Sequence, residues 1–165
     1  MTIIANPVNN MPRALFLCSG TGSVGITFRD AGWDVTDVDW DGRYGAEIQT
    51  DITTWDYESA FEKGHFDAVW ASPDCTQYSI ARTTAKTPRD FEKADQLVQS
   101  CRNIIGYLQP CCWLIEKPDS GYLKNRKVAE VYHMSVLTTL CIQIAHTASA
   151  RASGQNAQTG PPKMC

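Results

Sequence analysis

Residues 14–25 read ALFLCSGTGSVG, and this stretch decides the fold. Its apolar start is typical of a buried strand, and the glycine-rich turn that follows leads into a segment where Val24, Phe28 and Ala31 recur at helical spacing. Gly32 is suited to end that segment as a C-cap. The sequence therefore predicts a strand, a glycine turn and a helix in succession.

The rest of the chain continues this alternation of strands and helices. Further strands are predicted at residues 33–39, 47–49, 66–71 and 112–115. Helices are predicted at 57–63 and at 89–108, where apolar side chains recur every three or four residues until Pro110. Such alternation favours an α/β fold with a mostly parallel twisted sheet and flanking helices. Ligands then bind beyond the carboxyl ends of the strands.

The composition is that of one ordinary globular domain. The seven cysteines form neither a Cys-x-x-Cys pair nor a pattern typical of zinc sites or secreted proteins. No apolar run approaches the roughly 20 residues of a membrane span, and the first residues do not resemble a signal peptide. We expect a cytoplasmic domain over residues 1–145 that binds neither metal nor membrane, followed by an irregular tail at 146–165.

Charge is distributed unevenly along the chain. Residues 30–67 carry eleven acidic groups against two basic ones, whereas residues 82–127 carry nine basic groups against five acidic ones. The second segment could face a polyanion, although a solvated helix surface explains the same pattern.

A ligand site is indicated where the first two strands end. Gly20, Gly22 and Gly25 fit the G-x-G-x-x-G pattern, and Asp39 follows the second strand, where a carboxylate can accept hydrogen bonds from ribose. Asp51 could accept from an adenine amino group, or it could serve as a turn residue. These positions suit a nicotinamide dinucleotide and S-adenosylmethionine equally, and a tight turn without a ligand remains open.

A thiol and an acid follow the fourth and fifth strands. Cys75 lies in VWASPDCTQYS at 69–79, and Glu116 follows the fifth strand. If these strands are neighbours, the two side chains converge as a nucleophile and a proton donor. The polar neighbours of Cys75 argue against a buried, inert thiol, whereas Glu116 could also form a surface pair with Lys117 or Lys124.

These motifs resemble those of the DNA cytosine-5 methyltransferases, in the order that the family has them. The similar segments are LFLCSGTGS (15–23), VD (38–39), DI (51–52), the Pro-Cys loop SPDCTQYS (72–79) and IEKP (115–118). The resemblance spans residues 14–118, about two thirds of the chain. It implies a Rossmann-like S-adenosylmethionine-dependent methyltransferase fold that is incomplete at the C-terminus.

The resemblance also implies the roles of individual residues. Cys75 would add to C6 of a flipped cytosine in DNA while Glu116 protonates N3, so that C5 accepts the methyl group. The residues implied for S-adenosylmethionine are Phe16, Ser19, Gly20, Thr21, Gly22, Ser23, Asp39, Trp40, Asp51, Ile52, Ser72 and Pro73. Those implied for DNA are Thr76, Gln77, Ser79 and Arg82.

Three departures from the family pattern predict impaired activity. Asp74 stands where the family has proline, which loses a fixed backbone angle and adds a negative charge beside the thiol. Lys117 stands where the family has asparagine, and its cation favours the ionised form of Glu116. No Gln-x-Arg-x-Arg element or target-recognition domain follows residue 130.

We therefore expect an incomplete, phage-like catalytic domain. The alternatives are a nicotinamide-dependent oxidoreductase and a non-catalytic remnant that binds S-adenosylmethionine or DNA. The sequence leaves open the target site, DNA against RNA as substrate, and the oligomeric state.

Overall fold

The computed structural model of the 165-residue chain describes residues 11–82, 85–116 and 121–129. Lys117, the predicted tail at 146–165 and the segment after residue 130 where family motifs were sought lie outside these ranges. The predictions about them stay predictions.

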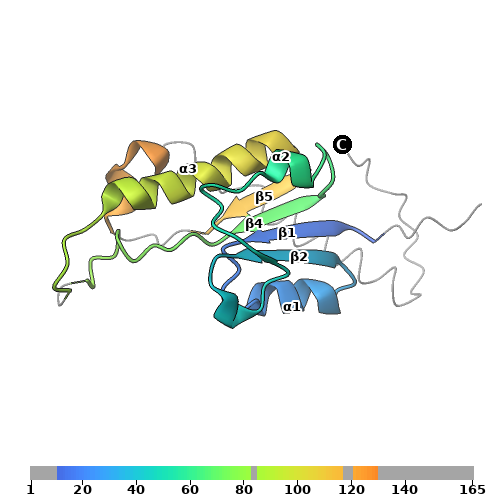
Figure 1. Ribbon diagram of the computed structural model, residues 1–165, viewed down its shortest axis with the longest axis horizontal. Helices are drawn as coiled ribbons and strands as arrows, with labels where there is room; N and C mark the ends of the chain where they lie inside the picture. Colours follow the sequence, from blue (N-terminus) through green and yellow to red (C-terminus); the bar gives the residue numbers. More distant parts are fainter. Residues whose placement is uncertain (1–10, 83–84, 117–120, 130–165) are drawn as a thin grey trace, which may run out of the picture.

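The strands form a single parallel sheet, as the alternating pattern predicts (Figure 1). They are β1 (Arg13–Leu17), β2 (Asp34–Asp39), β3 (Ile48–Gln49), β4 (Ala68–Ala71) and β5 (Cys112–Ile115), in the order β3-β2-β1-β4-β5. The α-helices are α1 (Ser23–Asp30), α2 (Tyr57–Ala60) and α3 (Phe91–Leu108). Three short 3₁₀ turns are η1 (Gly42–Tyr44), η2 (Tyr122–Asn125) and η3 (Lys127–Ala129).

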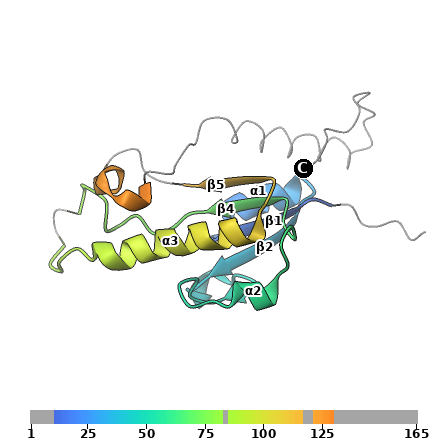
Figure 2. The ribbon, with the colours of Figure 1, turned by 90° about the horizontal axis from the view of Figure 1, so that it is seen from above.

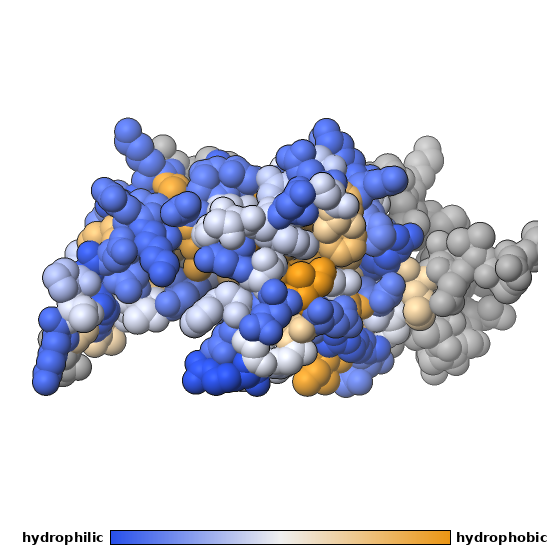
Figure 3. All heavy atoms as spheres, in the orientation of Figure 1, coloured by the Kyte–Doolittle hydropathy of each residue, from blue (hydrophilic) through white to orange (hydrophobic). Residues whose placement is uncertain are grey.

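Helices cover both faces of the sheet. Figures 1 and 2 show α1 on one face, and α2 and α3 on the other. The alternation of side chains along β1 fills both cores, because Leu15 and Leu17 pack in the cluster under α3 while Ala14 and Phe16 pack in the cluster under α1. Burying each of the larger apolar side chains contributes roughly 1.5–3 kcal/mol. The described part of the surface in Figure 3 is mainly hydrophilic.

Gly25 allows α1 to approach the sheet closely. A Cβ atom at this position would lie 3.0 Å from Oδ1 of Asp37 on β2. Asp37 is buried and is held by Arg29, whose Nη2 donates to Oδ2 over 2.7 Å. The third glycine of the motif is therefore needed for helix–strand packing.

Several element boundaries differ by a few residues from the sequence-based expectation, and helix α2 and strand β4 show a cause. Helix α2 ends at Ala60 rather than residue 63, because Phe61 is extended and its ring packs against Phe66, with centroids 4.8 Å apart. Strand β4 begins at Ala68 rather than residue 66. In both places tertiary packing of an aromatic side chain overrides the local pattern.

The strand order reverses between β1 and β4. The chain runs outward from β1 through β2 to β3, and then returns to the other side of β1 to form β4 and β5. The backbone amide of Ser72 after β4 donates to the carbonyl of Leu17 over 3.0 Å. The glycine turn and the Pro-Cys loop therefore leave the sheet side by side, at the point where such folds bind ligands.

Candidate active site at the strand ends

The glycine turn after β1 has a backbone that favours glycine. Gly20 and Gly22 have left-handed φ angles of 53° and 69°, and a Cβ atom on either would meet nothing within 4 Å. Glycine is thus favoured here by backbone angle and not by crowding. The open space beside the turn leaves room for a ligand to approach the chain.

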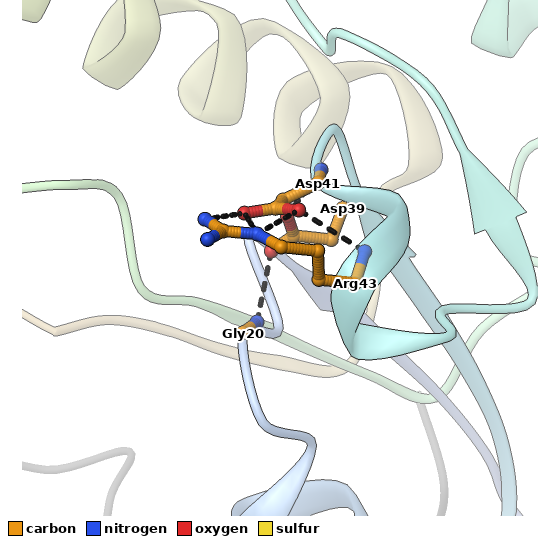
Figure 4. A network of polar contacts seen from close by, with 4 residues as sticks. All are labelled: Gly20, Asp39, Asp41 and Arg43. Atoms are coloured by element: carbon orange, nitrogen blue, oxygen red, sulfur yellow. Dashed lines mark hydrogen bonds and ion pairs between the residues drawn. The ribbon is translucent and has the colours of Figure 1, made fainter.

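Asp39 ties this turn to the end of β2. Its Oδ2 accepts a hydrogen bond from the Gly20 amide over 2.8 Å, and its Oδ1 accepts one from the Asp41 amide over 2.8 Å (Figure 4). The sequence-based expectation that Asp39 ends the second strand is confirmed. Each carboxylate oxygen has a second lone pair that can accept from a ribose hydroxyl.

Asp41 and Arg43 form an ion pair next to Asp39 that sequence reasoning missed. Nε of Arg43 donates to both carboxylate oxygens of Asp41 over 2.9 Å (Figure 4). Hydrogen bonds from Arg43 hold the pKa of Asp41 below its usual value. The signal in the sequence was the acid at every second position through Asp37, Asp39 and Asp41.

Trp40 follows β2 and Asp51 follows β3, and both are among the residues expected to bind the cofactor. Trp40 is 70% exposed, although large aromatic side chains are usually covered. Asp51 accepts from the amide and the hydroxyl of Thr53, both at Oδ1, over 2.9 and 2.7 Å. These bonds lower its pKa and make it a turn residue, while Oδ2 has no donor among the described residues. Ile52 is buried in the core.

Phe16 and Ser19, near the end of β1, differ in how well they could contact a ligand. Phe16 is 2% exposed and packs edge-on against Phe28 of α1 at 5.1 Å, so little of its ring is left for the expected contact with the cofactor. Strand alternation points it into the core. Ser19 has a buried Oγ without a hydrogen-bond partner among the described residues. That orphaned hydroxyl fits a site for a polar ligand, with the exposed Thr21 and Ser23 further along the turn.

Cys18, between β1 and the glycine turn, has a left-handed φ angle of 55°. Its pKa is raised, first by a hydrogen bond with Cys101 of α3 and then by burial. The thiol therefore stays protonated and serves packing, not catalysis.

The ends of β4 and β5 converge as the sequence predicts. Nε1 of Trp70 donates to Oγ of Ser72 over 3.0 Å, and Oγ of Ser72 donates to Oε2 of Glu116 over 3.1 Å. The Glu116 amide also donates to the Ala71 carbonyl over 2.8 Å. This relay fixes the direction of the Glu116 carboxylate, while Pro73 is buried where the loop leaves the sheet.

Asp74 restrains the loop in a way that sequence reasoning did not foresee. Its Oδ1 accepts hydrogen bonds from the amide of Thr76 over 2.8 Å and from the Thr76 hydroxyl. This Asx turn takes the place of the restraint that a proline would give. Cys75 is half-buried and packs against an apolar cluster that includes Tyr78 and Leu123.

The four residues expected at DNA also shape the loop itself. Oε1 of Gln77 accepts from Nη1 of Arg82 and from the Asp90 amide, each over 3.0 Å. Ser79 Oγ accepts from the Ala81 amide over 3.2 Å, and Thr76 bonds Asp74. In Figure 1 the loop between β4 and α3 extends to one side of the sheet. Contacts of these residues with DNA stay a prediction.

Among the described residues, no three His, Cys, Asp or Glu side chains lie together as possible metal ligands. In that same part of the chain, no helix is long and apolar enough to cross a membrane.

Comparison with known proteins gives one informative likeness. No family model matches the chain. The chain is 34% identical over 124 residues to a probable DNA (cytosine-5)-methyltransferase of Frog virus 3 (isolate Goorha). The match covers 68% of this chain and 56% of the viral protein, so the chain spans little more than half of that relative's length.

Proposed function

The chain belongs to the DNA (cytosine-5)-methyltransferase family, and on that premise we propose that its site transfers a methyl group from S-adenosylmethionine to C5 of cytosine in DNA. The observation that carries the proposal is the hydrogen bond from Ser72 to Glu116 over 3.1 Å. Ser72 lies in the same loop as Cys75, and Glu116 follows the neighbouring strand β5. It orients the Glu116 carboxyl group at the switch point of the sheet, where the loop that carries Cys75 begins. A nicotinamide enzyme would leave both groups without a role.

The residues after β1, β2 and β3 suit the cofactor. Ser19 offers a hydroxyl without a partner in the described structure, and Asp39 keeps accepting capacity for ribose. Trp40 offers an exposed ring for stacking, and Oδ2 of Asp51 can accept from an amino group. When bound, the cofactor supplies an electrophilic methyl group on a sulfonium sulfur.

The residues after β4 and β5 suit the cytosine. The thiolate of Cys75 forms a bond to C6, and the displaced electron pair moves toward N3, which takes a proton from Glu116. The resulting enamine makes C5 nucleophilic enough to accept the methyl group. A base then removes the C5 proton, the S–C6 bond breaks to restore the thiolate, and N3 returns its proton to Glu116. Ser72 orients Glu116 throughout. The target cytosine must be flipped out of the duplex to reach the thiol.

The decisive experiment is covalent trapping on a duplex that carries 5-fluorocytosine, with unmodified cytosine as the control. Fluorine cannot leave as a proton does, so the Cys75–C6 adduct accumulates after methyl transfer. We expect an adduct with the parent chain and none with Cys75→Ala. Calorimetry should show binding of S-adenosylmethionine and none of NAD.

An adduct that survives Cys75→Ala would disprove the mechanism. Cofactor binding without any adduct would instead identify a non-catalytic, cofactor-binding domain.

A further inference from the structure

Tyr78, three residues beyond Cys75, is anchored to helix α3. It is only 1% exposed, and its hydroxyl donates to Oδ1 of Asp95 over 2.7 Å. A buried hydroxyl that lost this acceptor would destabilise the folded protein. The second turn of α3 therefore fixes where the Tyr78 ring lies.

Arg126 completes this anchor from a third part of the chain. Its Nε donates to Oδ1 and Oδ2 of Asp95 over 3.2 and 3.0 Å, and its Nη2 also donates to Oδ2. The guanidinium lies 5.1 Å from the centroid of the Phe91 ring. Burial alone would raise the pKa of Asp95, but hydrogen bonds from Arg126 and Tyr78 outweigh it and lower that pKa. The carboxylate stays ionised at neutral pH.

Hydrogen bonds also hold the backbone around Tyr78. The Tyr122 amide donates to the Tyr78 carbonyl over 2.9 Å. Gly121 has a φ of 115°, and a Cβ atom there would lie 2.5 Å from the same carbonyl oxygen. Nη1 of Arg89 donates to the Gln77 carbonyl over 2.6 Å, and its guanidinium lies 4.9 Å from the centroid of the Tyr122 ring.

The position of Tyr78 is transmitted to the thiol through one tight turn. The amides of Tyr78 and Ser79 both donate to the carbonyl of Cys75, over 2.9 and 3.2 Å. Cys75 also packs against the buried cluster of Tyr78, Ala94, Val98 and Leu123. A shift of the Tyr78 ring therefore moves Cys75 relative to Glu116.

We propose that Asp95 and Arg126 are positioning residues, which act through Tyr78 to hold Cys75 where it can add to C6 of cytosine. The inference rests on the proposed function for its chemistry, while the anchoring contacts stand apart from it. Neither residue is expected to touch cytosine or the cofactor. Their effect should appear in the rate of covalent addition, because misplacing a reacting atom by about 1 Å can reduce a rate by 100-fold.

Four variants test this with two readouts. Asp95→Asn loses the charge that pairs with Arg126 and one of the two acceptor oxygens, and Tyr78→Phe removes the hydroxyl that bonds Asp95. Arg126→Lys keeps the charge but loses the paired hydrogen bonds, and Glu92→Gln is the control. Glu92 is exposed on the same helix and acts on Arg126 through its charge. The control therefore removes a charge near the anchor but leaves the hydrogen bonds of Asp95 in place. The first readout is the single-turnover rate of adduct formation on 5-fluorocytosine DNA, at saturating S-adenosylmethionine and below each variant's melting temperature. The second is the alkylation rate of Cys75 by iodoacetamide, followed by peptide mass spectrometry.

We expect Asp95→Asn and Tyr78→Phe to slow adduct formation roughly 10- to 100-fold, with Arg126→Lys between them and the control. The dissociation constant of S-adenosylmethionine should stay within about twofold of the parent, which a general loss of folding would not allow. Combining Asp95→Asn with Tyr78→Phe should slow adduct formation by less than the product of the two single effects, because the two residues share one hydrogen bond. Alkylation of Cys75 should become several-fold faster as its packing loosens.

Two outcomes separate this inference from the proposed function. If the parent forms no adduct, the methyl-transfer proposal fails, and the alkylation rates alone judge the anchor. If the folded variants match Glu92→Gln in adduct formation, or in alkylation where no adduct forms, the positioning role is overturned. Should Asp95→Asn not fold, Tyr78→Phe carries the test, because it removes a single hydroxyl.

Discussion

The backbone amide of Gly20 donates a hydrogen bond to Oδ2 of Asp39 over 2.8 Å, across 19 residues of sequence. The two meet because β1 and β2 are parallel neighbours whose register pairs Leu17 with Val38. Asp39 thus holds the glycine turn in place. Its carboxylate also lies next to that turn, which would face the cofactor. Under the proposed function, one residue would serve both the shape of the site and its affinity for the cofactor.

Asp39→Asn should weaken S-adenosylmethionine binding. An amide side chain offers one oxygen where two backbone amides need acceptors, so the Gly20 or the Asp41 amide loses its partner. We expect a loss of about 1.5–3 kcal/mol, or roughly 10- to 100-fold in the dissociation constant measured by calorimetry. Asp30→Asn, on the exposed end of α1, is the control and should bind as the parent does. If Asp39→Asn binds S-adenosylmethionine as tightly as the parent, Asp39 is not part of the cofactor site.

Glu116→Gln and Ser72→Ala should both slow adduct formation, to different degrees. The first removes the proton donor and should reduce the single-turnover rate by at least about 100-fold. The second removes only the group that orients the carboxylate and leaves Nε1 of Trp70 without its acceptor, so we expect roughly a 10-fold reduction. Equal effects would mean that Ser72 supports the loop as a whole and does not specifically orient Glu116.

Asp74→Pro and Asp74→Ala should have opposite effects on the same rate. The alanine variant loses the Asx turn to Thr76 and frees the loop, so adduct formation should slow several-fold. The proline variant restores a fixed φ angle and removes a charge beside the thiol, so the rate should rise. A rise in both variants would show that the charge of Asp74 matters more than the turn.

Gly25→Ala and Gly106→Ala form a matched pair for stability. Both glycines are helical, and alanine in a helix is favoured by about 0.8–1.0 kcal/mol. A Cβ atom at Gly106 would meet nothing within 4 Å, so Gly106→Ala should stabilise the protein in urea unfolding. At Gly25 the new carbon would press on Asp37 at 3.0 Å, and we expect destabilisation by about 1–3 kcal/mol. Stabilisation by Gly25→Ala would mean that α1 can shift away from β2 at little cost.

The sequence predicted which residues lie at the strand ends better than it predicted the contacts around them. The strand pattern predicted that Gly20 and Asp39 lie at neighbouring strand ends, and that the fourth and fifth strands bring Cys75 and Glu116 together, because parallel strands end at one edge. The neighbouring strands are confirmed, and the contact with Glu116 is made by Ser72. The burial of Phe16 follows from the alternation of side chains along β1, which the family resemblance does not take into account.

The anchor of Tyr78 had no local signal at all. Asp95 accepts from Tyr78 and from Arg126, which are 17 and 31 residues away in sequence. In a helical pattern Asp95 is indistinguishable from a solvated surface acid. Arg126 reaches Asp95 because η2, which precedes it, packs against the loop that carries Tyr78. This packing depends on the whole fold.

His65 should make the protein less stable as the pH falls below neutral. Its pKa is lowered in the folded state, first by burial and then by Arg13, whose Nη1 lies 3.2 Å from Nδ1 of the ring; Asp34 and Glu62 oppose this weakly. Below pH 6.5 the unfolded chain therefore takes up a proton that the folded protein resists, and this favours unfolding. The contribution of His65 is full above pH 6.5 and declines as the pH falls toward the lowered pKa. Urea midpoints at about pH 7.5 and about pH 5.5 should differ less for His65→Gln than for the parent, and an equal difference in both would show that His65 takes no part.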